Sequence, residues 1–369
     1  MTTPIAASLF HVTVQPSGRT FQVDADTTLL AASISQAVGL PYGCKDGACG
    51  SCKCKLLSGQ VSHGQHYETA LSPEEESAGY VLTCCAHAHS DLQLESKQVT
   101  PFGAFPIKKL PTRVMTLTKV TNDVMVLKLQ LPANDNFQYQ AGQYIDFILR
   151  DGDRRSYSMA SIAAAVPVAS LASTPSGNPA LLELHIRHMP GGKFTDHVFG
   201  TMKEKEILRL EGPFGSFYLR EDSESPVVML ASGTGFAPIK ALLENMHAKN
   251  LSRKTWLYWG ARRPVDLYMN QWVVEFAASH SWLQYVPVVS DALAEDGWNG
   301  RTGLVHRAVL NDHPDLSGFQ VYACGVPAMV DAARTEFSAV AGLDPDAYFA
   351  DAFISQADVS TNSPATNPA

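Results

Sequence analysis

Apolar and polar residues alternate in short runs over much of the first 220 residues. Residues 10–14 and 20–23 have the period-two pattern of half-buried strands, and residues 27–38 have helical spacing. Residues 113–131 and 181–187 alternate over longer spans, with turn-forming residues between them. Alternating runs at this spacing predict antiparallel strands that close into a barrel.

The pattern changes at about residue 226. Residues 227–230 form a short, wholly apolar run, which a glycine-rich turn and a helical stretch at 238–248 follow. Further buried runs with helical patterns between them occupy residues 256–259, 285–289 and 321–323. Strand and helix in alternation predict an α/β domain with a parallel sheet.

A chain of 369 residues is too long for one ordinary core and suits two or three domains. We expect a fold that combines α+β and α/β domains. The proline-containing segment 101–111 is the expected linker after the first domain. The expected domains span residues 8–100, 108–220 and 224–355.

Two segments lack any periodic pattern. Residues 163–180 are small and of low complexity, which predicts a surface loop inside the second domain. The tail at 356–369 is polar and contains proline, so we expect it to be disordered.

Composition narrows the class of protein. With 45% hydrophobic and 17% charged residues the chain is globular, and its net charge of −8 speaks against binding to nucleic acid. No apolar run approaches the ~20 residues that cross a bilayer. The opening MTTPIAASLF lacks the basic start of a secretory signal. We therefore expect a cytoplasmic protein with no membrane contact.

Six of the seven cysteines fall in the first quarter of the chain. Four residues separate Cys44 from Cys49, two separate Cys49 from Cys52, and 31 separate Cys52 from Cys84. This is the plant-type spacing for a [2Fe–2S] cluster. Small residues between the first three cysteines allow the tight loop and the close backbone approach that such a cluster needs.

Two other metal sites fit the spacing less well. A structural zinc site pairs two CxxC-like knuckles, whereas here the second half offers only the adjacent Cys84 and Cys85. A Rieske centre would use His87 and His89, but a full set of thiolates exists without them. We interpret Cys54 as a small packed side chain. The spacing alone leaves the choice between Cys84 and Cys85 open.

A second group of residues suits a flavin. The string Arg155-Ser156-Tyr157-Ser158 ends a predicted strand and offers an arginine for phosphate, an aromatic ring for the isoalloxazine and a hydroxyl for its N5. The string Gly191-Gly192-Lys193-Phe194-Thr195 begins 33 residues after Ser158, where two glycines precede a predicted helix whose free N–H groups suit a pyrophosphate. A turn of sequence GPFGSF at 212–217 then ends the domain.

A third group suits a nicotinamide dinucleotide. The string GTGFAP at 233–238 follows a buried strand and opens a helix, the context that a phosphate-binding turn requires. Cys324 and Gly325 follow the last buried strand, where a second loop should face the first across the carboxyl edge of the sheet. This position favours a place for Cys324 beside the nicotinamide ring over a purely structural thiol.

The choice between NADH and NADPH rests on the next loops. Arg262 and Arg263 follow a strand end and suit a 2′-phosphate, or a solvated surface. Asp291, after the next strand, would repel that phosphate, so we expect NADH, with NADPH as the alternative.

With these three groups in hand, the chain resembles the ferredoxin–NADP reductase superfamily from about residue 10 to residue 353. It is most similar to three-domain electron-transfer reductases with a ferredoxin domain first, an FAD domain second and an NAD domain third. The strings PYGCKDGACGSCK, RRSYSMAS, HIRHMPGGKFTDHVF and LASGTGFAPIKA resemble those of CDP-6-deoxy-Δ3,4-glucoseen reductases. The resemblance implies a β-grasp [2Fe–2S] ferredoxin domain, an antiparallel β-barrel FAD domain and a parallel-sheet α/β NAD domain.

The resemblance also implies the site residues. The cluster ligands would be Cys44, Cys49, Cys52 and Cys84. The FAD-binding positions would be Arg155, Tyr157, Ser158, His185, Arg187, Gly191, Gly192 and Thr195. The nicotinamide-binding positions would be Gly233, Thr234, Gly235, Pro238, Cys324 and Gly325. A C-terminal aromatic–acidic element near the flavin would comprise Phe349, Asp351 and Phe353, and the catalytic residues would be Ser158, Cys324 and Asp351.

The implied activity is transfer of electrons from NADH to FAD, then to the cluster and then to a partner protein. A flavin takes two electrons at once and releases them singly, which links a hydride donor to a one-electron cluster. The implied partner is an iron–sulfur PMP dehydrase of deoxysugar synthesis, or alternatively an oxygenase component. A protein of another class, a redox sensor that holds the same cofactors, would not need the hydride-transfer residues.

Overall fold

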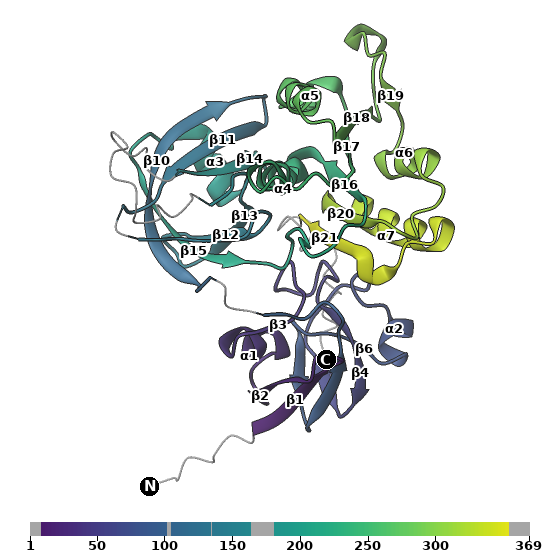
Figure 1. Cartoon of the computed structure of the whole chain (residues 1–369). Coiled ribbons are helices and arrows are strands. Elements are labelled where there is room, and N and C mark those ends of the chain that lie inside the picture. Colours follow the sequence, from purple (N-terminus) through teal and green to yellow (C-terminus); the bar gives the residue numbers. More distant parts are fainter. Residues whose placement is uncertain (1–8, 102–104, 134, 164–180, 354–369) are drawn as a thin grey trace, which may run out of the picture. The chain divides into compact units, whose positions relative to one another are not determined.

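The computed structural model describes residues 9–101, 105–133, 135–163 and 181–353 (Figure 1). The chain divides into two compact units, one of residues 1–104 with 350–369 and one of residues 105–349. The loop that we expected at 163–180, apart from residue 163, and the tail at 356–369 lie outside the described residues.

The first unit contains a mixed five-stranded sheet with the strand order β2-β1-β8-β4-β6. β1 (Leu9–Gln15) pairs antiparallel with β2 (Arg19–Asp24) and parallel with β8 (Leu92–Glu95). This mixed sheet, with one helix after the first hairpin, confirms the predicted β-grasp. The remaining elements are α1 (Leu29–Ser35), β3 (Val38–Gly39), β4 (Lys53–Ser58), β5 (Val61–His63), α2 (Pro73–Ser77), β6 (Tyr80–Leu82), β7 (Ala86–Ala88) and β9 (Thr100–Pro101).

Helix α1 is shorter than the stretch 27–38 that its periodicity predicts. The Thr28 hydroxyl caps its start and accepts a hydrogen bond from the Ala31 N–H at 3.3 Å. The helix ends because Ala37 adopts a left-handed φ of 59°, and Val38 already belongs to β3. The apolar residues after the helix therefore belong to a strand.

The second unit begins with six antiparallel strands in the order β13-β12-β15-β10-β11-β14. The two end strands meet at an antiparallel bridge between Met159 and Leu184, which closes the sheet into the predicted barrel. Leu127, Ile145 and Leu210 are among the fully buried residues of its core. The elements are β10 (Lys108–Lys119), β11 (Val124–Gln130), β12 (Tyr144–Ile148), β13 (Arg154–Ser158), β14 (Leu181–Arg187), α3 (Lys193–Gly200) and β15 (Ile207–Phe214).

A second six-stranded sheet follows in the order β19-β18-β17-β16-β20-β21, and its pairs from β19 to β20 are parallel (Figure 1). This confirms the predicted α/β domain. Its strands are β16 (Val227–Ser232), β17 (Thr255–Ala261), β18 (Leu283–Val289), β19 (Arg301–Thr302), β20 (Gln320–Gly325) and β21 (Tyr348–Ala352). Its helices are α4 (Phe236–Ala248), α5 (Asn270–Ser279), α6 (Val305–Asp312) and α7 (Pro327–Ala341), with short 3₁₀ turns η1 (Gly233–Gly235), η2 (Pro264–Asp266), η3 (Ala294–Asp296) and η4 (Pro345–Ala347).

None of the helices within the described residues is long and apolar enough to span a bilayer.

Candidate redox centre and nucleotide sites

The four cysteines of the predicted cluster lie as two pairs in the first unit. The backbone N–H groups of Cys44 and Cys49 each donate to the other residue's Sγ at 3.3 Å. The Sγ atoms of Cys52 and Cys84 lie 3.2 Å apart. Among the described residues, no group of three or more Cys, His, Asp or Glu side chains has the arrangement for a single metal ion. A [2Fe–2S] cluster takes four thiolates, two on each iron, so a pair of pairs fits that group.

The two remaining cysteines of this unit differ in position. Cys54 lies on β4, is 3% exposed, and burial raises its pKa to about 12, as expected for a packed thiol. Cys85 lies at the loop itself, with its Sγ 3.5 Å from that of Cys84. A Cβ on Gly47 would lie 2.7 Å from the Cys85 sulfur, so this position must be glycine for the loop to close over Cys85. The distance from Cys52 favours Cys84 as the fourth ligand.

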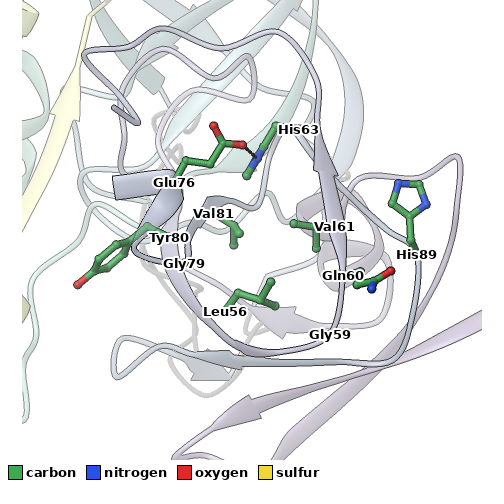
Figure 2. Close-up of a pocket in the computed structure, with 10 residues that line it drawn as sticks. All are labelled: Leu56, Gly59, Gln60, Val61, His63, Glu76, Gly79, Tyr80, Val81 and His89. Atoms are coloured by element: carbon green, nitrogen blue, oxygen red, sulfur yellow. Dashed lines mark hydrogen bonds and ion pairs between the residues drawn. The ribbon is translucent and has the colours of Figure 1, made fainter. Parts of the chain in front are cut away.

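A hollow of about 430 Å³ lies in the same unit, between β5, α2 and β6 (Figure 2). His63 Nδ1 and the Glu76 carboxylate lie 2.8 Å apart at its edge (Figure 2). No cysteine lines it. This hollow is therefore separate from the predicted cluster ligands.

In the second unit, the residues predicted to bind the flavin end strand β13. Ser158 is buried, at 7% exposure, as the last residue of the strand. Arg155 and Tyr157 are half-buried. The Tyr157 ring lies 5.3 Å from that of Phe194, centre to centre, and burial raises its pKa. The strand thus presents a cation, an aromatic ring and a hydroxyl within four residues.

The predicted pyrophosphate turn precedes helix α3. Gly191 has a φ of +84° with open space where a side chain would begin, and Gly192 is the N-cap, with no capping side chain. The Thr195 hydroxyl donates to the Met189 carbonyl at 2.8 Å and accepts from the Met189 N–H at 3.2 Å. Thr195 thus holds the turn in shape, and the uncapped start of the helix fits an anionic group.

Asp153 joins these two predicted flavin segments. Its carboxylate lies 3.3 Å from the Arg155 guanidinium and 2.7 Å from the Lys193 ammonium. Lys193 also contacts Asp151 at 2.7 Å. Neither Asp151 nor Asp153 could be predicted from the sequence, because an acid beside a cation is common on any surface, whereas Lys193 lies within the predicted pyrophosphate turn. In the structure, Asp151 and Asp153 hold the cations of Arg155 and Lys193 at one end of the barrel.

His185 and Arg187, which we predicted as flavin-binding, lie on β14. The His185 ring is fully buried, and its nitrogens lie 2.8 Å from the Tyr268 hydroxyl and 3.0 Å from the Glu183 carboxylate. Arg187 Nε donates to Asp123 at 2.9 Å. Since both ring nitrogens of His185 have partners, a contact between His185 and a flavin would have to come from its main chain.

The two predicted nicotinamide loops interlock at the carboxyl edge of the parallel sheet. A Cβ on Gly235 would collide with the Cys324 carbonyl, and one on Gly325 would collide with Ser232. The Ser232 hydroxyl accepts a hydrogen bond from the Val326 N–H at 2.9 Å. Both glycines are therefore required by close backbone approach. The loops face each other as the sequence predicts.

The other predicted residues of these loops are largely buried. Thr234 is 8% exposed in η1, and Pro238 lies in the first turn of α4 among buried neighbours. Cys324 is fully buried at the end of β20. Of the C-terminal element, Asp351 is 7% exposed on β21 and Phe353, just beyond that strand, is half-buried.

Three family models cover most of the chain. Residues 12–89 match the 2Fe-2S iron-sulfur cluster binding domain, residues 111–218 match the oxidoreductase FAD-binding domain, and residues 229–335 match the oxidoreductase NAD-binding domain. The CDP-6-deoxy-L-threo-D-glycero-4-hexulose-3-dehydrase reductase of Yersinia pseudotuberculosis is 40% identical over 93% of this chain and 98% of its own length. The chain belongs to the three-domain iron–sulfur flavoprotein reductases.

Other relatives of the reductase serve oxygenases. Reductase component 1 of terephthalate 1,2-dioxygenase from Comamonas is 30% identical over 93% of this chain and 97% of its own length. The crystal structure of a cytochrome P450 reductase from Amycolatopsis matches with a TM-score of 0.72 and 31% identity, over 93% of this chain and 98% of that one. The reductase is thus an NAD(P)H-dependent oxidoreductase with a [2Fe–2S] domain, an FAD domain and an NAD domain.

The fourth cluster ligand of the reductase is open to a direct test. Cys85→Ala should keep two irons per chain, because the Cys52 sulfur lies 3.2 Å from Cys84 and Cys85 is the next residue outside that pair. Cys84→Ala should lose the visible cluster absorbance. Iron content and absorbance of the two purified variants check this, and the reverse result would move the ligand by one residue.

Proposed function

We propose that this reductase carries electrons from NADH through FAD and the [2Fe–2S] cluster to an iron–sulfur PMP dehydrase of deoxysugar synthesis. The observation that carries the proposal is the 40% identity to the Yersinia dehydrase reductase over 93% of the chain. The identity to the Comamonas and Pseudomonas oxygenase reductases is 30 and 31% over 93 and 88% of the chain. An oxygenase component is the second candidate acceptor.

The proposed roles follow the geometry. Cys44, Cys49, Cys52 and Cys84 would hold the cluster, which passes on one electron at a time. Arg155 and the turn at Gly191 would hold the FAD pyrophosphate, and Ser158 would donate to the flavin where hydride arrives. Cys324 would lie beside the nicotinamide, and Asp351 near the flavin.

Acceptor choice can be measured with both partners. NADH oxidation by the reductase should be coupled to product formation when the Yersinia-type dehydrase and its CDP-hexulose substrate are supplied. We expect a coupled rate at least about tenfold above that with the terephthalate dioxygenase component, because docking surfaces discriminate partners by repulsion as well as attraction. The Cys49→Ser variant is the control for electron delivery through the cluster. Equal or faster turnover with the oxygenase component would overturn the proposed acceptor.

We also propose that NADH is the preferred donor. The Arg262 guanidinium lies 3.2 Å from Asp291, and Arg263 binds Asp296 through two nitrogens at 2.6 and 2.8 Å. Both cations are thus paired with carboxylates that would repel a 2′-phosphate.

The kcat/KM for NADH should therefore exceed that for NADPH. Replacing Asp291 with Asn should lower the ratio of kcat/KM for NADH to kcat/KM for NADPH by about tenfold, since the replacement removes a repulsive charge and frees Arg262. Steady-state rates with the two donors settle the point. A preference of the native protein for NADPH would identify Arg262 and Arg263 as phosphate-binding residues.

A further inference from the structure

Strand β14 has two chemically different faces. Leu182, Leu184 and Ile186 are fully buried in the barrel core. The alternate residues Glu183, His185 and Arg187 point the other way, because side chains along a strand alternate between its faces. Glu183 and His185 each contact a residue of the α/β domain, and Arg187 pairs with Asp123 of the barrel.

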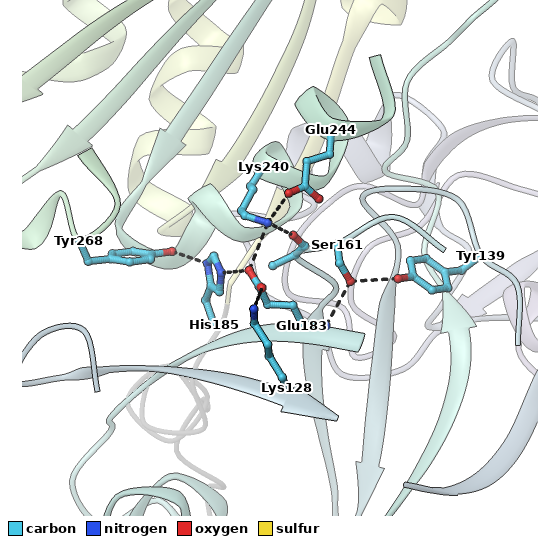
Figure 3. A network of polar contacts seen from close by, with 9 residues as sticks. Lys128, Tyr139, Ser161, Glu183, His185, Lys240, Glu244 and Tyr268 are labelled. Atoms are coloured by element: carbon cyan, nitrogen blue, oxygen red, sulfur yellow. Dashed lines mark hydrogen bonds and ion pairs between the residues drawn. The ribbon is translucent and has the colours of Figure 1, made fainter. Parts of the chain in front are cut away.

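Lys240 makes the central contact. It lies on α4, the helix that follows the Gly233–Gly235 turn, and its side chain is 6% exposed. Its ammonium lies 3.2 Å from Glu183 on β14 (Figure 3). The ammonium also donates to the carbonyl of Ala160, just beyond β13, at 3.0 Å. One ammonium thus joins the nucleotide-binding helix to two strands that carry the predicted flavin site.

Tyr268 makes the second contact. Its hydroxyl lies 2.8 Å from Nδ1 of His185 (Figure 3). Its ring meets that of Trp259 edge-on at 5.2 Å. The Trp259 indole N–H in turn donates to the Gly233 carbonyl at 3.1 Å. A Cβ on Gly233 would also lie 3.0 Å from the Arg187 guanidinium. Tyr268 and Trp259 therefore connect the glycine turn to β14, and Gly233 leaves room for the Arg187 guanidinium.

The charges in this network are balanced. Lys240 also contacts Glu244 at 2.6 Å, and Lys128 lies 3.4 Å from Glu183. Burial would raise the pKa of Glu183, but the hydrogen bond with His185 and the charge of Lys240 outweigh it and lower the pKa to about 2. Burial lowers the pKa of His185, which fits a neutral ring that donates to Glu183 and accepts from the Tyr268 hydroxyl. The Glu183 carboxylate is thus ionised at neutral pH.

We propose that Lys240 is a positioning residue for hydride transfer. Through Glu183 and the Ala160 carbonyl it fixes the start of α4, and with it the nicotinamide, against the strand that ends in Ser158. This inference rests on the proposed roles of Ser158 and of the Gly233–Gly235 turn. Lys240 would touch neither substrate nor cofactor and would act by setting the distance between the nicotinamide and the flavin.

The test compares Lys240→Met with Lys249→Met. Methionine keeps most of the length of the buried side chain and removes its charge. Lys249 caps the other end of the same helix and forms an exposed ion pair with Glu221 at 2.6 Å, so its replacement is a matched control. Glu183→Gln is a second variant, which breaks the Lys240–Glu183 ion pair by removing the charge of the glutamate with little change of shape. If Lys240→Met does not fold, Glu183→Gln alone tests the inference.

Stopped-flow traces of the FAD-loaded protein give the rate of flavin reduction and the apparent Kd for NADH. We expect the limiting rate of Lys240→Met to fall by about 10- to 100-fold, since a displacement near 1 Å can cost that much. The Kd should change by less than about threefold, because the turn that binds the nucleotide is intact. The long-wavelength charge-transfer absorbance of the nicotinamide–flavin complex should weaken in parallel, and Lys249→Met should match the native protein.

Two results would overturn the inference. One is an unchanged limiting rate in both Lys240→Met and Glu183→Gln. The other is a loss of FAD or NADH binding that accounts for the slower rate, which would make the pair merely structural. If NADH did not reduce the flavin of the native protein, the proposed function itself would fail. If the native protein were reduced and the Lys240 variant were reduced at the same rate, only the inference about Lys240 would fail.

Discussion

Cys49→Ser is expected to abolish the visible absorbance of the cluster and with it all electron delivery to the acceptor protein. Cys49 is 4% exposed, and its backbone and sulfur take part in both hydrogen bonds of the first cysteine pair. Serine would leave one iron with a single thiolate, and the cluster requires four in total. Iron analysis, absorbance and the coupled acceptor assay measure the loss.

The same variant should keep its FAD and most of its NADH–ferricyanide activity. The cysteines lie in the first compact unit. The predicted flavin and nucleotide residues from 155 to 325 lie in the second, and Asp351 and Phe353 belong to the first. Separate cores fold independently. We expect the ferricyanide rate to stay within about twofold of the native value. Cys54→Ser is the control, because Cys54 is a buried thiol of β4 and not one of the two pairs. An equal loss of FAD in Cys49→Ser would contradict the division into units.

Ser158→Ala should slow the reduction of flavin by NADH by about 10²-fold. We expect the lost hydroxyl to donate where hydride arrives, and a donor of this kind typically contributes a factor of 10²–10³ to the rate. FAD should stay bound, since Arg155 and the turn at Gly191 are unchanged. Electron transfer from reduced flavin to the cluster should change much less, because it depends on distance and not on that hydrogen bond.

Stopped-flow traces at flavin and cluster wavelengths separate these two steps. Ser156→Ala offers a matched control on the same strand, since the Ser156 hydroxyl already donates to Asp146 at 2.6 Å. Flavin reduction at the native rate in Ser158→Ala would show that Ser158 is an ordinary residue of the strand edge.

Features that depend on neighbours in the sequence could be predicted. The strand predicted at 181–187 is Leu181–Arg187 in the structure, because a period of two is a local property. The spacing of the four cysteines predicts the cysteine loop, and the glycines at 233 and 235 predict the turn before α4, for the same reason. The end of α1 was missed because the apolar pattern continues into β3, and only the left-handed Ala37 separates helix from strand.

Contacts between distant residues could not be predicted. Lys240 and Glu183 are 57 positions apart, and His185 and Tyr268 are 83 apart, so no local pattern pairs them. Lys193 and Lys240 are the two lysines of the described helices, and most lysines lie on the surface, so the residue type does not predict burial of Lys240. A lysine that interrupts the apolar face of a predicted helix, as Lys240 does between Ile239 and Ala241, is the one available signal.

The alternation along β14 bears on the construction of chimeric reductases. A natural place to exchange NAD domains is the segment between β15 and β16, where one core ends and the next begins. An exchange there would leave Glu183, His185 and Arg187 unchanged, while helix α4 and the residue at position 268 would come from another reductase. Chimeras that transfer these three residues together with the new NAD domain should transfer hydride, and those cut only at the segment should bind both nucleotides but couple them poorly.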